Sequence, residues 1–258
     1  MKAKKSYGQH FLNNPIITEN IVEGLSYSGY ENVLEVGPGK GVLTEFLIKK
    51  GIKLKVVEAD RDMVNHLLYR FPNFAENIIQ DDFLKVNITK IFDGKPFALI
   101  GNYPYNISSQ ILFKMVENRD LIPEMVGMFQ KEVAKRVIAP PGSKVYGVIS
   151  VLIQAYYEGT YLFDVNPENF DPPPKVMSGV IRLTRKNQIS LGCDEKLFRA
   201  VVKSAFNQRR KMLRKTLKQF LPNVDLQKEI FFTKRPEMLS VEEFVKLTNW
   251  ISENKSKE

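Results

Sequence analysis

Short apolar runs rich in β-branched residues recur along the first half of the chain, and helical patterns follow or separate them. The runs are Asn32–Val36, Leu54–Val57, Asn77–Gln80, Phe97–Ile100 and Met125–Phe129. Strands that alternate with helices in this way predict a parallel sheet, and therefore an α/β domain. Two later runs, Tyr161–Val165 and Val180–Leu183, flank the proline-rich stretch 171–175 and predict two further strands.

Local chemistry also predicts where two helices begin. Asn14 is placed to cap a helix whose first residue is Pro15, because proline is favoured at that position. The apolar residues of this helix share one face: Ile17, Ile21, Val22 and Leu25. A second helix is predicted from Ser108 onward, with the buried face Ile111, Leu112 and Met115.

The pattern changes near residue 186, after which only helices are predicted, over Lys196–Leu221 and Val241–Ile251. We therefore expect one α/β domain over residues 1–186 and a small, basic, all-α domain over residues 187–258. Between Lys196 and Lys218 there are nine Lys or Arg and no acid. On an unbroken helix, one arc beside the apolar face would hold Arg210, Lys211, Arg214, Lys215 and Lys218.

This basic arc predicts a phosphate-binding surface. Arg209 falls within the apolar arc instead, so we expect it to reach an acid or a carbonyl group. The N-terminal Lys2, Lys4 and Lys5 are predicted to add an arm to the same surface.

The full chain of 258 residues carries 38 Lys and Arg against 29 Asp and Glu, a net charge of +9 that favours an anionic partner such as nucleic acid. The single cysteine, Cys193, cannot form a disulfide within the chain, and two histidines give a poor supply of metal ligands. No metal is therefore expected. Without an apolar leader or a membrane-length apolar run, we expect a soluble, cytoplasmic protein, and a monomer by default.

A glycine-rich turn follows the first predicted strand of the sheet. Its glycines stand at positions 37, 39 and 41, whereas a dinucleotide-binding loop would need a third glycine where Val42 stands. Gly37 and Gly39 let the backbone approach a ligand closely. Acids follow successive strands: Glu35 and Glu58 can accept the ribose hydroxyls, and Asp82 can accept an adenine amino group. Three acids suit a positively charged nucleoside, which predicts S-adenosylmethionine as the cofactor.

The segment Gly101–Asn106 follows the fourth predicted strand and fits the methylation of an exocyclic amine. The lone pair of adenine N6 is delocalised into the ring, so an enzyme must accept hydrogen bonds from both of its N–H groups. The Asn102 side-chain oxygen and the Pro104 backbone carbonyl are the predicted acceptors, and Tyr105 offers a face for an extruded base. No strong general base is needed, because the sulfonium group is already activated.

These motifs resemble those of the KsgA-type small-subunit ribosomal RNA adenine dimethyltransferases. The matching blocks are Tyr7–Leu12, Glu35–Gly39, Gly101–Ser108, Gln130–Val133, Phe170–Val176 and Ala205–Lys211. The family usually has Asn where His10 stands and Leu where Tyr103 stands, and we expect Tyr103 to pack. The resemblance implies a Rossmann-like class I S-adenosylmethionine-dependent methyltransferase domain followed by a small helical domain that binds RNA.

The resemblance also implies the substrate and the site. The expected reaction is the transfer of two methyl groups to N6 of each of two adjacent adenines, in the loop of the 3′-terminal hairpin of 16S RNA, during biogenesis of the small ribosomal subunit. The implied cofactor contacts are His10, Leu12, Gly37, Glu58, Asp82 and Asn102. Phe170 is expected to sandwich the flipped adenine against Tyr105, although from the residues alone a core aromatic at a strand end is nearly as plausible.

Two alternatives remain open at this stage. A 23S RNA adenine methyltransferase of the macrolide-resistance type would share the glycine loop and the Asn-x-Pro-Tyr block, but the blocks at 207–211 and 235–237 favour the KsgA type. A second alternative is a ribosome-assembly factor whose main role is to bind the immature small subunit. The intact segment Asn102–Tyr105 argues against a purely non-catalytic protein.

Overall fold

The structure is a computed structural model that describes residues 4, 8–187, 190–222, 226 and 229–255. The chain forms two compact units. Unit 1 comprises Met1–Lys135 and Glu158–Arg185, and unit 2 comprises Arg136–Tyr157 and Lys186–Glu258. Residues 136–157 thus belong with the C-terminal residues, whereas the sequence analysis placed them in the first domain.

Unit 1 is built on a seven-stranded sheet with the strand order β4-β3-β2-β5-β6-β9-β7. The strands are β2 (Asn32–Val36), β3 (Lys53–Glu58), β4 (Ile78–Gln80), β5 (Phe97–Asn102), β6 (Glu124–Gln130), β7 (Tyr157–Val165) and β9 (Ser178–Arg185). Strands β2 to β6 pair in parallel, and β9 pairs antiparallel with β6. All seven predicted runs are therefore strands, and the mostly parallel sheet is confirmed.

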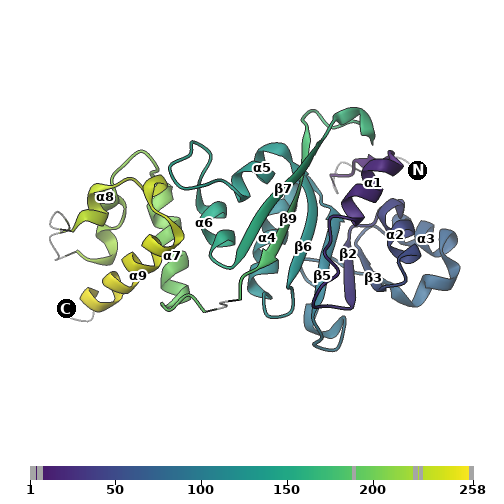
Figure 1. Cartoon of the computed structure of the whole chain (residues 1–258), viewed down its shortest axis with the longest axis horizontal. Helices are drawn as coiled ribbons and strands as arrows, with labels where there is room; N and C mark the ends of the chain where they lie inside the picture. Colours follow the sequence, from purple (N-terminus) through teal and green to yellow (C-terminus); the bar gives the residue numbers. More distant parts are fainter. Residues whose placement is uncertain (1–3, 5–7, 188–189, 223–225, 227–228, 256–258) are drawn as a thin grey trace. The chain divides into compact units, whose positions relative to one another are not determined.

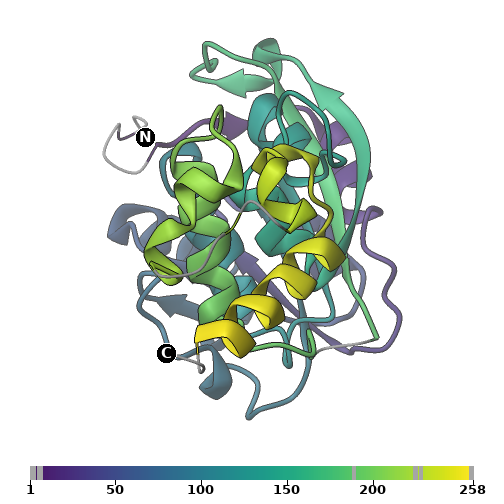
Figure 2. The same cartoon turned by 90° about the vertical axis from the view of Figure 1, so that its left-hand side faces the viewer.

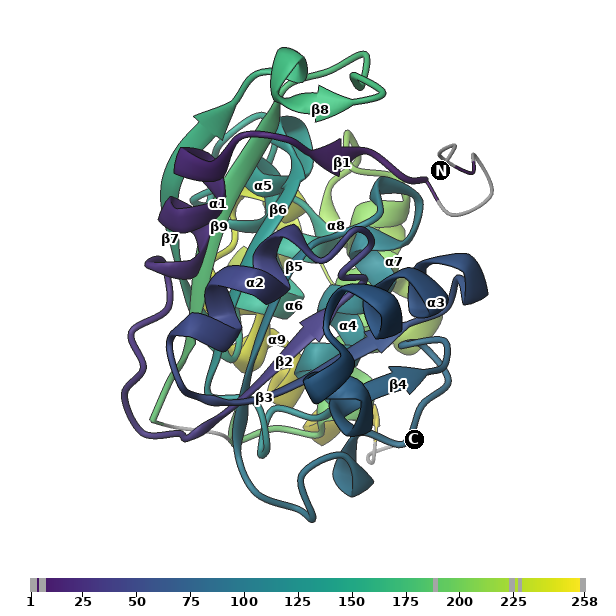
Figure 3. The ribbon, with the colours of Figure 1, turned by 90° about the vertical axis from the view of Figure 1, so that its right-hand side faces the viewer.

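Helices cover both faces of this sheet, which explains why its central strands are mostly apolar. They are α1 (Pro15–Val22), α2 (Val42–Lys49), α3 (Arg61–Arg70), α4 (Ser108–Glu117) and α5 (Lys131–Val137). Figures 1 and 3 show α1, α2 and α3 on one face and α4 on the other. The Asn14 side chain caps α1 by accepting from the N–H groups of Ile16 and Ile17, as predicted.

A short two-stranded sheet joins the N-terminal segment to the proline-rich stretch. Strand β1 (Phe11–Leu12) pairs antiparallel with β8 (Phe170–Asp171), and Leu12 lies opposite Phe170. Figure 3 labels both strands. This pairing fixes residues 8–12 at the edge of the sheet where the parallel strands end.

Unit 2 is helical, as predicted. Its helices are α6 (Val148–Gln154), α7 (Glu195–Asn207), α8 (Leu213–Thr216) and α9 (Val241–Lys255). Figure 2 shows α7, in green, beside α9, in yellow, and the fully buried side chains of Phe198, Val202 and Phe244 form part of their packing. Among the described residues, no helix has the length and apolar character needed to cross a membrane.

The predicted helix Lys196–Leu221 is wrong in one respect, because α7 ends at Asn207 and the chain turns before α8 begins. Within the turn, the Lys211 N–H donates to the Gln208 carbonyl at 2.8 Å, and the Leu213 N–H donates to the Lys234 carbonyl at 2.9 Å. Arg209 lies in the turn and donates to the Ser143 carbonyl at 3.0 Å. One local turn bond and two contacts with distant residues, Lys234 and Ser143, thus take the place of the next helical turn, and local propensity alone does not reveal them.

Candidate active site

A cavity of about 300 Å³ lies at the carboxyl ends of β2, β3 and β5. It is lined by five segments: residues 8–12, 36–43 except Gly41, 57–59, 81–84 and 102–107. From β2 the chain continues to β3 and β4 on one side, whereas β5 and β6 lie on the other side. The cavity therefore lies where the strand order reverses, which is the usual ligand position in open α/β sheets.

The glycine loop forms one wall of the cavity. Gly37 has a φ of +68°, and a Cβ built on it would meet no atom within 4 Å. A side chain here would project into open space beside the cavity from a strained backbone. This conformation lets a ligand approach the main chain.

Glu58 ends β3 directly beside this loop and is only 7% exposed. Its Oε2 accepts from the Gly39 N–H at 3.0 Å, and its Oε1 accepts from the Asp60 N–H at 2.9 Å. Burial raises the pKa of Glu58, and these main-chain N–H groups oppose the rise. Each carboxylate oxygen keeps a further lone pair, so the group can also accept from the hydroxyls of a ribose.

Asp82 lines the cavity beyond β4. Its Oδ1 accepts from the Leu84 N–H at 2.9 Å, which fixes the carboxylate at the start of the loop. The side chain is 39% exposed. Its position next to Phe83 and Leu84 suits the edge and face of an adenine ring.

Glu35 does not belong to this site, contrary to the expectation that it could contact the ribose. It is 1% exposed, does not line the cavity, and accepts from the Thr44 hydroxyl at 2.6 Å. Burial raises the pKa of Glu35 to about 8, so it is mainly protonated at neutral pH. The side chain lies under the loop toward α2, and of the three predicted acids only Glu58 and Asp82 line the cavity.

Asn102 ends β5 and faces the cavity. Its Nδ2 donates to the His10 backbone carbonyl at 2.8 Å. Among the described residues, none donates a hydrogen bond to its Oδ1. The amide is therefore held with its oxygen available as an acceptor, which is the role predicted for it.

The other predicted acceptor, the Pro104 carbonyl, is already engaged. It accepts from the Ile107 N–H at 3.2 Å and from the Ser108 hydroxyl at 3.2 Å. Both contacts belong to the turn that opens α4. The carbonyl oxygen has two lone pairs, so its capacity for a substrate N–H is reduced.

Tyr105 is fixed at its hydroxyl and on one face. The hydroxyl is 2.6 Å from the Ser178 hydroxyl oxygen. The ring lies nearly parallel to that of His10, with 5.5 Å between centroids and 27° between planes. The structure thus brings His10, Asn102 and Tyr105 together at one end of the cavity.

Tyr103 is buried, which confirms the expectation that it packs. Its ring lies 5.0 Å from that of Phe129. A Cβ at Gly127 would overlap the Tyr103 ring, and one at Gly101 would lie 2.9 Å from it. Two glycines therefore make room for a tyrosine at a position where the resembling family usually has leucine.

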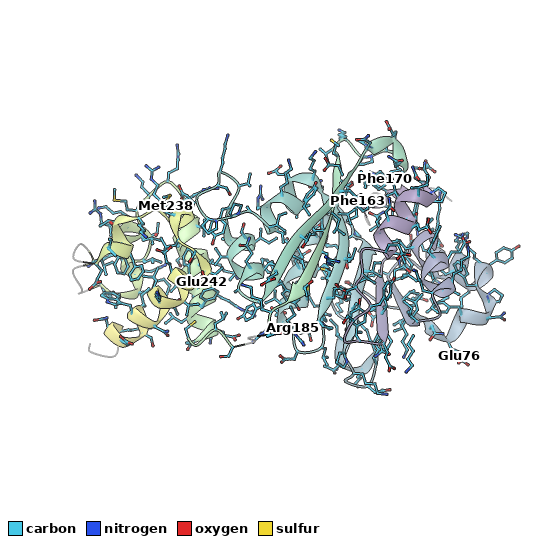
Figure 4. The ribbon with its side chains drawn as sticks, in the orientation of Figure 1. Glu76, Phe163, Phe170, Arg185, Met238 and Glu242 are labelled. Carbon is cyan, nitrogen blue, oxygen red and sulfur yellow. The ribbon has the colours of Figure 1, made fainter. Side chains whose placement is uncertain are left out.

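Leu12 lines the cavity and also belongs to the core, but Phe170 belongs to the core alone. Phe170 is 3% exposed and does not line the cavity; Figure 4 labels it together with Phe163, which packs against the same core cluster. The structure therefore does not bring Phe170 to the cavity, and its predicted place against the target base stays a prediction. Its pairing with Leu12 across β1 and β8 accounts for the burial.

The predicted basic residues of unit 2 lie on the surface but do not share one helical face. Arg210 and Lys211 lie in the turn after α7, Arg214 and Lys215 in α8, and Lys218 in the next short helix. All are exposed except Arg214, which is half-buried. Arg209 was expected to reach an acid or a carbonyl, and it does, since it lies 3.8 Å from Glu237 besides its bond to Ser143.

The N-terminal segment has a role that sequence reasoning missed. Lys4 pairs with Asp60 at 2.6 Å and with Asp62 at 2.7 Å, and Gln9 donates to Asp60 at 2.9 Å. Lys4 therefore anchors a cavity wall and was wrongly expected to contribute to a basic arm; Lys2 and Lys5 lie outside the described residues. The sequence does signal Asp60 as a cap for α3, but nothing in it indicates its contacts with Lys4 and Gln9.

The mostly parallel sheet, the glycine loop after β2 and the cavity where the strand order reverses together define a Rossmann-like class I methyltransferase. Two solved structures share the fold. A dimethyladenosine transferase from Plasmodium falciparum superposes with a TM-score of 0.79 at 24% identity, covering 95% of this chain and 98% of that one. The 23S rRNA methyltransferase ErmE superposes with a TM-score of 0.66 at 22% identity, covering 92% of this chain and 99% of that one.

Sequence comparison narrows the class to a family. The model of the ribosomal RNA adenine dimethylases matches residues 1–253, and this chain belongs to that family. A ribosomal RNA small subunit methyltransferase A from Bacteroides thetaiotaomicron is 56% identical over 254 residues, which span 98% of this chain and 95% of the relative. The protein of the same name from Flavobacterium johnsoniae is 53% identical over 251 residues, or 97% of this chain and 96% of the relative.

Proposed function

We propose that this chain transfers methyl groups from S-adenosylmethionine to N6 of two adjacent adenines in the 3′-terminal hairpin loop of 16S RNA, two to each adenine. The observation that carries the proposal is the orientation of Asn102. Its Nδ2 is committed to the His10 carbonyl, so its Oδ1 is presented to the cavity as a fixed acceptor. Such an acceptor is what an N6 amino group needs before it can act as a nucleophile.

The cavity residues fit the cofactor. Glu58 provides carboxylate oxygens for the ribose hydroxyls, Asp82 provides an acceptor for the adenine amino group, and Gly37 leaves room for the ligand beside the main chain. These acids also suit the positive charge of a sulfonium. When bound, S-adenosylmethionine supplies an activated methyl group. Among the described residues, no cluster of three His, Cys, Asp or Glu could hold a metal ion.

The protein's own residues position the nucleophile. Asn102 Oδ1 accepts from N6–H and localises the nitrogen lone pair, and the fixed ring of Tyr105 orients the base. A base must leave its stack to reach a cavity of this size. The flipped adenine then presents N6 toward the cofactor end of the site.

Family membership and charge support RNA as the substrate. The net charge is +9, and exposed basic residues gather in and after the turn that follows α7. We propose that Arg210, Lys211, Arg214, Lys215 and Lys218 contact RNA phosphates. The relatives' name favours the small subunit over 23S RNA, so we propose the immature small subunit as the partner of a monomeric enzyme in the cytoplasm.

The test is to incubate the protein with labelled S-adenosylmethionine and, separately, with unmethylated small subunits, free 16S RNA, 23S RNA and DNA. The labelled nucleosides are then identified after digestion. Dimethyladenosine from the small subunit or from 16S RNA supports the proposal. Label in 23S RNA or DNA alone, or label that persists undiminished in Asn102→Ala, would contradict it.

A further inference from the structure

The loop that follows β4 is held by a lysine of α4. Lys114 Nζ donates to the Phe83 carbonyl at 2.5 Å and to the Val86 carbonyl at 2.8 Å. Among the described residues, no other group donates to either carbonyl. The same nitrogen lies 5.2 Å from the centroid of the Phe83 ring. One half-buried ammonium group therefore binds this loop at two points of its main chain and at one aromatic ring.

The main chain of the loop turns around Asp82. The N–H groups of Lys85 and Val86 donate to the Asp82 carbonyl at 2.8 Å and 2.9 Å. The Leu84 N–H donates to the Asp82 carboxylate at 2.9 Å. Burial lowers the pKa of Lys114, and the charge of Asp82 is the largest of those that oppose the change. The ammonium group thus holds the same turn that orients the Asp82 carboxylate.

Lys114 itself does not line the cavity, whereas Asp82, Phe83 and Leu84 do. Any effect of Lys114 on a bound ligand must therefore pass through the loop. The Asp82 side chain is 39% exposed, so burial does not fix it, and its position depends on the turn that carries it. A hydrogen bond to a carboxylate is short and weakens steeply when the two groups are misaligned.

Lys114 lies on a helix that starts beside the proposed substrate-binding segment. It is in the second turn of α4, whose first residue, Ser108, directly follows the cavity segment 102–107. We propose that Lys114 is a positioning residue that places the Asp82 carboxylate against the amino group of the cofactor's adenine, and so makes the site selective for that base. The inference rests on the proposed function, because it requires Asp82 to accept from that amino group.

A pair of ligands isolates this hydrogen bond. S-adenosylhomocysteine, the product form of the cofactor, carries the adenine amino group, and its 6-deamino analogue has hydrogen in that place. Calorimetry gives the dissociation constant of each, and their ratio measures what the amino group contributes to binding. In the wild-type chain we expect the analogue to bind at least about tenfold more weakly, the value of one hydrogen bond to a charged group.

Lys114→Met removes the ammonium donors but keeps a long unbranched side chain, and we expect the ratio to fall to about threefold or less. Lys114→Gln keeps an amide N–H on a shorter side chain and should give an intermediate ratio. Lys55→Met is the matched control, because Lys55 Nζ donates to the Ile91 carbonyl at 2.7 Å and lies 5.4 Å from the centroid of the Phe92 ring, outside the cavity. Its ratio should equal that of the wild type.

A second readout separates positioning from a general loss of structure. We expect Lys114→Met to transfer methyl groups within about threefold of the wild-type rate in a single turnover at saturating S-adenosylmethionine, because the loop does not carry Asn102. A merely structural role would instead weaken binding of both ligands equally, and the ratio of their dissociation constants would not change.

A wild-type ratio in both Lys114 variants, or an equal fall in Lys55→Met, would overturn the inference. A ratio near one in the wild-type chain would contradict the assignment of Asp82 to the adenine amino group in the proposed function, and the inference with it. The two failures are distinct, because the first is measured on variants and the second on the unaltered protein.

Discussion

The two units differ in how well their functional residues could be placed. In unit 1, Gly37, Glu58, Asp82 and Asn102 were predicted from separate strand ends, and the structure gathers all four around one cavity. In unit 2, five basic residues were predicted on one helical arc, and the structure distributes them over a turn and two short helices. The same kind of reasoning selected the residues in both units, but only in unit 1 does the structure bring the selected residues together.

The difference has a geometric cause. The carboxyl ends of parallel strands meet at one edge of the sheet whatever the lengths of the connections, so an error of one residue changes little. A helical face depends on every residue continuing the helix, because each one rotates the chain by about 100°. Here α7 ends at Asn207, so the residues beyond it do not continue the predicted arc.

The largest expected effect is on the rate of methyl transfer and concerns Asn102 in unit 1. Asn102→Ala removes the fixed acceptor at N6, and we expect the rate of methyl transfer to fall by about 100- to 1,000-fold, as when a preorganised hydrogen-bonding group is lost. Single-turnover transfer to small subunits measures it. The control is Asn249→Ala, whose amide donates to the Gly192 carbonyl at 3.1 Å in unit 2. A rate within tenfold of wild type would show that Asn102 is not the acceptor.

The next effect concerns the glycine loop. Gly37→Val places a side chain beside the cavity, and we expect affinity for S-adenosylmethionine, measured by calorimetry, to fall by about 30-fold or more, equivalent to roughly 2 kcal/mol. Gly29→Val is a matched control, because Gly29 has a φ of +80° and no atom within 4 Å of a built Cβ, but lies outside the cavity.

Both glycine variants carry similar backbone strain, so both should lose a similar amount of thermal stability. Only Gly37→Val should lose cofactor affinity. Equal affinities in the two variants would remove the loop from the cofactor site and would weaken the contrast between the two units.

A smaller effect tests unit 2 directly. Reversing the charges in Arg214→Glu and Lys215→Glu together should weaken RNA binding and flatten the slope of log affinity against log salt by about 1.5, the contribution of roughly two phosphates. Binding to 16S RNA across a salt series measures the slope. Lys255→Glu, in the last turn of α9, changes a charge of the same sign elsewhere. If the double variant and Lys255→Glu had the same slope, the RNA contact would lie outside α8.

Much of the structure of unit 1 could be predicted because it depends on local sequence patterns. Asn14 and Pro15 define a helix start, the glycine spacing excludes a dinucleotide loop, and the buried strands are mostly apolar runs. The sequence does not indicate contacts between distant segments. Phe170 was predicted to lie against the target base, whereas the structure pairs β8 with β1 and buries the ring, and no pattern in either short segment indicates that pairing.

The predicted boundary between the two domains was wrong for a similar reason. Residues 136–157 have the apolar pattern of any α/β connection, yet they pack with the C-terminal helices. The Gly142 N–H donates to the Glu237 carbonyl at 2.6 Å, and α6 packs on α7. A sequence pattern indicates that a face is apolar, but it does not indicate which unit covers that face.

The smallest effect concerns Glu35, an acid beside the glycine loop that the structure assigns to packing. Burial raises its pKa to about 8 in the folded chain, from the ordinary value of 4.5. Between these two values the folded state holds a proton that the unfolded state has released, so the contribution of Glu35 to stability is full below about pH 4.5 and falls as pH rises to about 8.

Glu35→Gln removes this dependence. We expect its melting temperature to rise relative to wild type from pH 5 to pH 8 and then to level off. Scanning calorimetry of both proteins across this range measures the difference, in which the acids common to both chains cancel. A difference that stays constant with pH would mean that Glu35 is ionised in the fold, and the loop acid would return to the list of candidate ligands for the cofactor.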